Sequence, residues 1–205
     1  MDNNKMIEVL DWAYEKSLNG IPGSSSAEEL AQEYLDENNG NVIKACDSLI
    51  NWQIAKCATS GFLSGLGGII TLPVAIPANV SSVIYVQIRM IAAIAYMGGY
   101  DLKDDSVKSL VYICLTGSAA ANIAKDVGIK LGTKLTESAI RKISYAAITK
   151  INQAVGFRMI TKFGSKGIIN LGKAIPLVGG IIGGGIDSLS TNTIGNVAKE
   201  AFLAN

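Results

Sequence analysis

Apolar residues recur every three or four positions along most of this 205-residue chain. This spacing predicts amphipathic helices, and no stretch shows the strict alternation of apolar and polar residues that a half-buried strand requires. The predicted helices cover about 4–18, 26–38, 42–59, 61–71, 79–97, 104–124, 126–154, 155–172 and 187–201, with 126–154 forming one or two of them. The pattern therefore predicts an all-α fold, a compact multi-helix bundle with no substantial sheet.

Polar side chains mark where the first three helices begin. Ser26 and Glu29 have the spacing of a capping box, in which two reciprocal hydrogen bonds satisfy backbone N–H groups at a helix start. Asn3 or Asn4 is expected to cap the first helix, and Asn41 the third, because a short polar side chain can accept a hydrogen bond there.

The longest uncharged run covers 32 consecutive residues, from Cys57 to Ile88. Uncharged runs of about 18 residues or more normally indicate a membrane span, but several glycines and then Pro73 and Pro77 interrupt this one. A second uncharged segment, 174–186, is thirteen residues long. We therefore expect Gly/Pro-rich apolar core helices rather than a simple membrane-spanning helix.

Charge is unevenly distributed, although the formal net charge is only +1. Residues 1–52 hold ten acids and three bases, whereas 53–205 hold seven acids and fifteen bases. We predict a single domain, 1–205, with an acidic helical N-terminal subregion (1–56) and an apolar and basic helical core (57–205). Such asymmetry favours an anionic partner.

Four basic residues are the candidates for a membrane-facing surface. On a continuous helix, Lys130, Lys134 and Arg141 would fall within a narrow arc at 100° per residue, and Lys142 is their neighbour. These residues predict a basic face that meets anionic membrane lipid. Nucleic acid is the weaker alternative, because the basic residues lack the interleaved aromatic side chains on which bases stack.

The residues that usually carry catalysis are largely missing. The chain has no histidine, which excludes Ser-His and Cys-His nucleophile pairs and His-containing metal sites. The span from Gly167 to Lys173 matches the spacing Gly-x-x-x-x-Gly-Lys, but Ala174 replaces the Ser or Thr that a phosphate-binding loop needs, and no strand is predicted before it. We predict no catalytic, cofactor-binding or metal-binding residue, and an enzyme of unrecognised type is the less favoured alternative.

Arg89 is the most unusual single residue, because it lies in the middle of an apolar predicted helix. A buried guanidinium is costly unless it is paired. Asp187 is equally isolated, so we predict a buried polar pair between Arg89 and Asp187 that orients two helices. The alternatives are that Arg89 makes a polar contact inside a ligand pocket or with a lipid headgroup, or that its head reaches the surface.

Several ordered motifs resemble the EcsC protein family. They run from Gly61 to Pro77, Gln87 to Asp101, Val155 to Gly164 and Ile175 to Asp187, and the Asn-Gly-Ile-Pro-Gly sequence at 19–23 accompanies them. The resemblance covers nearly the whole chain. It implies a shared architecture at Pro73, Pro77, Arg89, Asp101, Gly180 and Asp187. It supplies no catalytic residues, because the family, which is largely bacterial, has no agreed enzymatic activity.

The expected function is that of a non-enzymatic, amphitropic protein that meets anionic lipid through a basic face and apolar Gly-rich helices. The alternative is a soluble helical module with an apolar pocket for a lipid-like ligand or a partner helix. The polar, acidic start of the chain lacks the pattern of a signal peptide, and three cysteines without paired spacing are typical of reduced proteins. These features predict a cytoplasmic protein, peripheral at the inner face of the membrane; the oligomeric state is left open.

Overall fold

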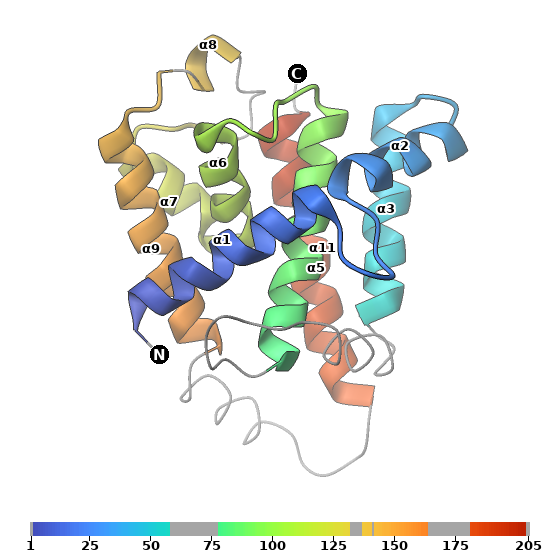
Figure 1. Ribbon diagram of the computed structural model, residues 1–205, viewed down its shortest axis with the longest axis horizontal. Coiled ribbons are helices and arrows are strands. Elements are labelled where there is room, and N and C mark those ends of the chain that lie inside the picture. The colour runs from blue at the N-terminus through green and yellow to red at the C-terminus, as the bar shows by residue number, and fades with distance from the viewer. Residues whose placement is uncertain (1, 58–77, 132–136, 141, 164–180, 204–205) are drawn as a thin grey trace.

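The computed structural model describes residues 2–57, 78–131, 137–140, 142–163 and 181–203. Within these ranges all regular secondary structure is helical, with no strand and only one isolated bridge, between Ile21 and Ser24. The predicted all-α bundle is therefore confirmed (Figure 1). The helix predicted over 61–71 lies outside the described residues.

The helix bounds agree with the sequence pattern in the N-terminal half and differ from it in the C-terminal half. The elements are α1 (Asn3–Asn19), α2 (Ala27–Glu37), α3 (Val42–Cys57), α5 (Ala78–Met97), α6 (Asp105–Leu115), the 3-10 turn η1 (Gly117–Ala119), α7 (Ala120–Asp126), α8 (Glu137–Ile140), α9 (Tyr145–Phe163) and α11 (Ile181–Phe202). The last helix thus begins before the predicted start at Asp187.

The helix caps follow the expected chemistry with one correction. Ser26 and Glu29 form the predicted capping box at the start of α2, and the Asn41 side chain accepts the Lys44 N–H at 3.0 Å. The predicted cap of α1 was wrong: Asp2, one residue earlier than expected, accepts the Lys5 N–H at 2.9 Å. A carboxylate at this position also interacts favourably with the helix dipole.

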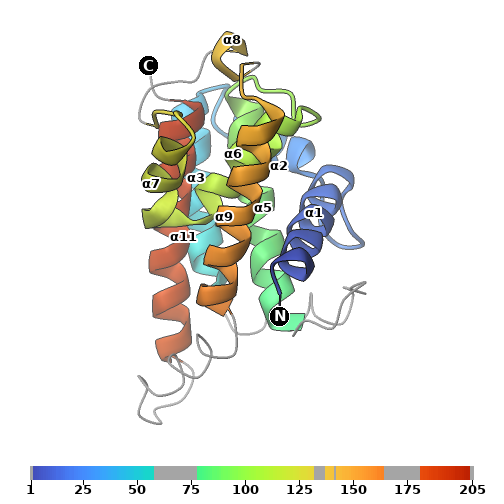
Figure 2. The same cartoon turned by 90° about the vertical axis from the view of Figure 1, so that its left-hand side faces the viewer.

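Helix α5 forms the centre of the bundle, and α1, α2, α3, α6 and α11 all pack against it (Figures 1 and 2). Among the described residues, Val80–Met97 is the one helical stretch that is long and apolar enough to cross a membrane, and 94% of it is buried inside the protein. Burial against protein explains its composition, since each buried apolar side chain contributes roughly 1.5–3 kcal/mol to folding. This stretch is therefore a core helix.

The helix predicted over 104–124 is broken in the structure. It ends at Leu115, and the chain continues through η1 into α7 at an angle of 116°. Gly117 lies at the break with φ of 60°, a conformation that costs other residues about 1–2 kcal/mol. The uninterrupted apolar pattern gave no sign of this bend. Residues at the bend line a cavity.

The helix ends that flank the two longest undescribed ranges lie at the same end of the molecule. The end of α3 and the start of α5 flank 58–77, and the end of α9 and the start of α11 flank 164–180. All four helix ends lie toward the lower end of the molecule in both views (Figures 1 and 2). Helix α8 lies at the opposite end, at the top of both views.

Candidate functional sites: a buried arginine and a cationic cavity

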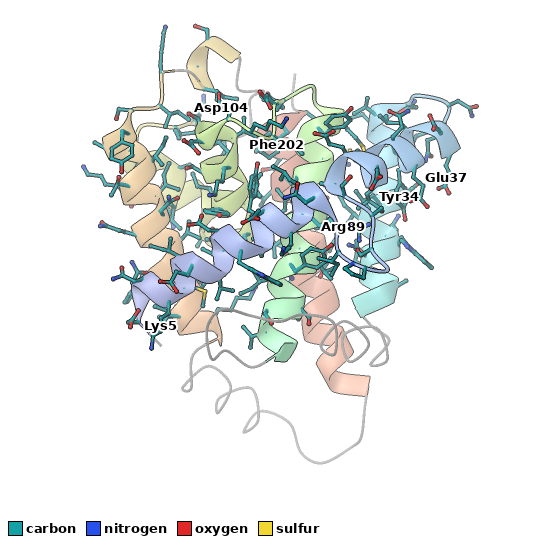
Figure 3. The ribbon with its side chains drawn as sticks, in the orientation of Figure 1. Lys5, Tyr34, Glu37, Arg89, Asp104 and Phe202 are labelled. Atoms are coloured by element: carbon teal, nitrogen blue, oxygen red, sulfur yellow. The ribbon has the colours of Figure 1, made fainter. Side chains whose placement is uncertain are left out.

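Arg89 is buried on α5, with only 8% of its surface exposed. Its Nη1 donates a hydrogen bond to the Ser24 hydroxyl, and its Nη2 donates to the Ser25 hydroxyl at 2.8 Å. The Tyr85 hydroxyl donates to the same Ser24 oxygen at 3.2 Å. Figure 3 shows Arg89 beside the loop that joins α1 to α2. We call these four residues the Arg89 cluster.

The loop that presents the serines is built by local turn chemistry. Pro22 is followed by Gly23 with φ of 79°, and the Ser24 N–H donates to the Ile21 carbonyl at 2.8 Å. Proline and then glycine at a positive φ are the features of a type II turn. The turn therefore fixes the local conformation of the loop that presents Ser24 to Arg89.

Two opposing effects act on the pKa of Arg89 in this cluster. Burial lowers the pKa of Arg89, while Tyr85 and the nearby acid Glu33 raise it. Because a guanidinium stays protonated in proteins, Arg89 carries a buried positive charge. Its N–H groups donate hydrogen bonds to hydroxyl oxygens. Its Nε has no hydrogen-bond partner among the described residues. The cluster fixes the α1–α2 loop onto the central helix.

The predicted partner of Arg89 stays a prediction. Asp187 lies on α11, but its side chain is outside the described part of the structure. Sequence reasoning did foresee that Arg89 would be buried. It did not foresee the serines, because they lie about 64 residues earlier in the chain and serine carries no charge that would signal a partner.

The predicted helical stripe of basic residues was wrong in its geometry. Lys130 lies beyond the end of α7 and outside any helix, while Lys142 lies in a turn after α8; both side chains are exposed. Lys134 and Arg141 lie outside the described residues. The 100° rule therefore does not relate these positions. That they face lipid stays a prediction.

A partly open cavity of about 490 Å³ lies between α9, α11 and the bend after α6. The bend contributes two hydroxyls and a glycine, α9 two cations and a hydroxyl, and α11 two more hydroxyls. The described residues that line it are Thr116, Gly117, Ser118, Arg158, Thr161, Lys162, Ser190 and Thr193. No carboxylate is among these described residues. We call this space the cationic cavity.

The two cations of the cavity are positioned by helix spacing. Arg158 and Lys162 are four residues apart on α9, so they lie on the same face. Arg158 is exposed and Lys162 is half-buried. Lys162 Nζ donates to the Ser190 hydroxyl at 2.9 Å, which links α9 to α11 across the cavity. The lysine head is thus held toward the interior rather than free in solvent.

Sequence reasoning missed the cationic cavity. Arg158 and Lys162 belong to the group of ten bases between 125 and 173, and their spacing was a usable signal. The hydroxyls carry no such signal, because Thr116 and Thr193 come from elements far apart in the sequence. The bend at Gly117, which brings them together, was also unforeseen.

Chemically, the described lining of the cavity suits an anion, and no catalytic set is found among these described residues. With no histidine in the chain, none of its hydroxyls has an imidazole base to activate it. Among the described residues, no group of three or more Cys, Asp or Glu side chains could hold a metal ion. Cys46 and Cys114 are fully buried thiols, and burial raises both pKa values.

Comparison with known proteins gives a family and nothing finer. No curated protein and no solved structure matches the chain. The model of the EcsC protein family matches residues 5–203, which is nearly the whole chain and includes both the Arg89 cluster and the cationic cavity. The resemblance seen in the sequence motifs is thereby confirmed, and the chain belongs to the EcsC protein family.

Proposed function

We propose that this protein acts by binding, as an amphitropic protein that associates with anionic membranes through one end of its bundle. That end is the one where α3 and α9 finish and α5 and α11 begin, and we call it the segment end. One observation carries the proposal: both long, charge-poor segments of the chain, 58–77 and 164–180, are bordered by helix ends at this same end.

The composition of these segments supports the proposal. Residues 58–77 contain no charge, and 174–186 contain none either. The other candidate for lipid contact, α5, is already buried in protein. Apolar surface gains about 25 cal/mol for each Å² removed from water, so segments of this composition would gain from contact with acyl chains.

The placement of charge supports an anionic surface. Arg158 and Lys162 lie on the last two turns of α9, which approach the segment end, and Lys166 and Lys173 follow in the sequence. A basic residue near an anionic bilayer contributes about 1 kcal/mol. The acidic helix α2 lies in the opposite half of the molecule in both views (Figures 1 and 2), where it would not be repelled.

The predicted basic face at Lys130 and Lys142 competes with this assignment. Lys142 follows α8, which lies at the far end of the molecule from the segment end. A flat bilayer cannot contact both ends at once. We therefore assign the membrane contact to the segment end, and in a cell we expect it at the inner face of the membrane.

The alternative function, a soluble module whose apolar pocket is anchored by Arg89, has less support. Both terminal nitrogens of Arg89 already donate to Ser24 and Ser25. A ligand would have to displace hydroxyls that are held by the Pro22-Gly23 turn, and a displaced buried hydrogen bond to a charge costs roughly 1.5–3 kcal/mol.

A fluorescence experiment tests the proposal. In a Cys57→Ser background, an NBD fluorophore is attached to Leu66→Cys in the first segment or to Ser138→Cys on α8. The fully buried Cys46 and Cys114 should not react with the label. With vesicles of phosphatidylcholine and phosphatidylglycerol, we expect a blue shift and brighter emission from position 66 and no change from position 138.

Three results would contradict the proposal. The first is an unchanged spectrum at position 66, and the second is an equal change at both positions, which would indicate adsorption without orientation. The third is failure of the unlabelled protein to float with these vesicles at low salt. Flotation should also weaken with pure phosphatidylcholine and at high salt, because exposed charges are screened.

A further inference from the structure

The cationic cavity shares Arg158 and Lys162 with the proposed membrane contact, but membrane association does not explain the hydroxyl groups gathered around them. We propose that it binds a phosphate group carried by a small organic molecule, with Arg158 and Lys162 as its cationic partners. A soluble phosphate ester and a phospholipid headgroup share this chemistry. Binding of a soluble ligand in the cavity requires no membrane, so titration can test the site apart from the proposed function although the two share Arg158 and Lys162.

The described lining of the cavity favours an anion. It includes two cations and five hydroxyl groups, and none of these described residues is an acid. A guanidinium and an ammonium are the side chains that most often bind phosphate, the first in bidentate geometry and the second as a point charge. Their separation of one helical turn on α9 allows both to reach one phosphate.

The hydrogen bonds within the cavity leave one hydroxyl, that of Ser190, able to donate to a ligand. The Ser190 hydroxyl accepts from Lys162, so its own O–H can donate to a ligand oxygen. The Thr116 and Thr161 hydroxyls instead donate to backbone carbonyls, of Ile113 and Arg158. Ser190 is therefore the hydroxyl best prepared to complete a phosphate site beside the two cations.

The size of the cavity sets the kind of ligand. Its volume of about 490 Å³ falls within the range of roughly 300–1,000 Å³ that is typical of small-molecule pockets. An inorganic phosphate ion would leave most of that space empty. The ligand therefore carries an organic group of modest size beside the phosphate.

Calorimetric titration of the full chain tests the site. The probes are inorganic phosphate, glycerol 3-phosphate, and dihexanoyl phosphatidic acid below its micelle concentration, with dihexanoyl phosphatidylcholine as the zwitterionic comparison. The variants are Arg158→Gln/Lys162→Gln and, as a matched control, Lys103→Gln/Lys150→Gln. The control removes the same charge from exposed positions, and Lys150 lies on the same helix.

We expect a phosphate-bearing probe to bind the native protein and to bind at least tenfold more weakly to the cavity variant, with the control unchanged. Equal binding of glycerol 3-phosphate and the short lipid would assign the site to phosphate esters in general. Binding of the lipid alone would assign it to a headgroup. Inorganic phosphate should bind more weakly than either organic probe.

The proposal is overturned if neither organic probe binds, if the cavity variant keeps its affinity, or if the control loses as much. Circular dichroism checks that the variants are folded. Ser190→Ala serves as a second variant, because it removes the proposed donor without changing charge. If the protein floats with vesicles but binds no organic probe, this inference is overturned and the proposed function is not.

Discussion

Two groups of hydroxyls surround cations in this protein, and they differ in how completely the cation is enclosed. In the Arg89 cluster, both terminal nitrogens of a buried guanidinium donate hydrogen bonds to serine hydroxyls, and a tyrosine hydroxyl donates to one of those serines. In the cationic cavity, Arg158 is exposed and Lys162 has a serine partner beside open space.

The difference separates a structural role from a binding role. A buried cation whose Nη1 and Nη2 already donate to serines has less left to offer a ligand, and its loss would leave unpaired hydroxyls in the core. An exposed cation at the edge of a cavity loses little when it is removed, but it retains its hydrogen-bonding capacity for a partner. The same residue types therefore serve stability in one place and recognition in the other.

The largest expected effect is on Arg89. We expect Arg89→Met to lower the free energy of unfolding by about 3 kcal/mol, because it leaves Ser24 and Ser25 without their donor and releases the α1–α2 loop. Arg158→Met should change it by less than about 0.5 kcal/mol, as is usual for surface positions. Urea denaturation monitored by circular dichroism measures both values, and equal losses would remove the distinction between the two sites.

Replacing the acceptor hydroxyls should give a smaller difference between the two sites in the free energy of unfolding. Ser24 accepts from both Arg89 and Tyr85, so Ser24→Ala leaves two donors unpaired and should cost about 2 kcal/mol. Ser190 accepts only from the half-buried Lys162, and Ser190→Ala should cost about 0.5 kcal/mol or less. If Ser190→Ala proved the more destabilising in the same urea series, the cavity would have to be regarded as part of the core.

The predictable part of the fold was the part encoded locally. The capping box of Ser26 and Glu29 and the Asn41 cap depend on neighbours three residues away, and both were confirmed. The burial of Arg89 was also predictable, because its whole helix is apolar. Local signals of this kind specify an element before any tertiary contact exists.

The unpredicted part depends on contacts between distant segments. The break at Gly117 interrupts an apolar pattern that reads equally well as one helix, and Ile194 and Thr193 of α11 pack against the break. The stripe through Lys130 failed because a turn replaces the assumed helix. The cavity could not be predicted from the sequence for the same reason. Most of its hydroxyls come close to its cations only when the bend after α6, α9 and α11 pack together.

The smallest expected effect compares the two glycines that shape these sites. Gly23 precedes Ser24 with φ of 79°, and Gly117 lies between Thr116 and Ser118 with φ of 60°. An added Cβ would meet nothing within 4 Å at Gly23 and only ordinary contacts of 3.6 Å at Gly117. Alanine should therefore cost about 1 kcal/mol at either position, through backbone strain alone.

The two alanine variants should nevertheless differ in ligand binding. Relief of strain at position 117 would shift the hydroxyls of Thr116 and Ser118 at the cavity wall, and a misfit of about 1 kcal/mol weakens affinity about fivefold. Gly23→Ala, with the same loss of stability, should leave the affinity for glycerol 3-phosphate unchanged. Titration of both variants beside their urea denaturation curves makes the measurement. Equal affinities would show that the bend at Gly117 shapes the fold without shaping the site, and the cavity would then depend on α9 and α11 alone.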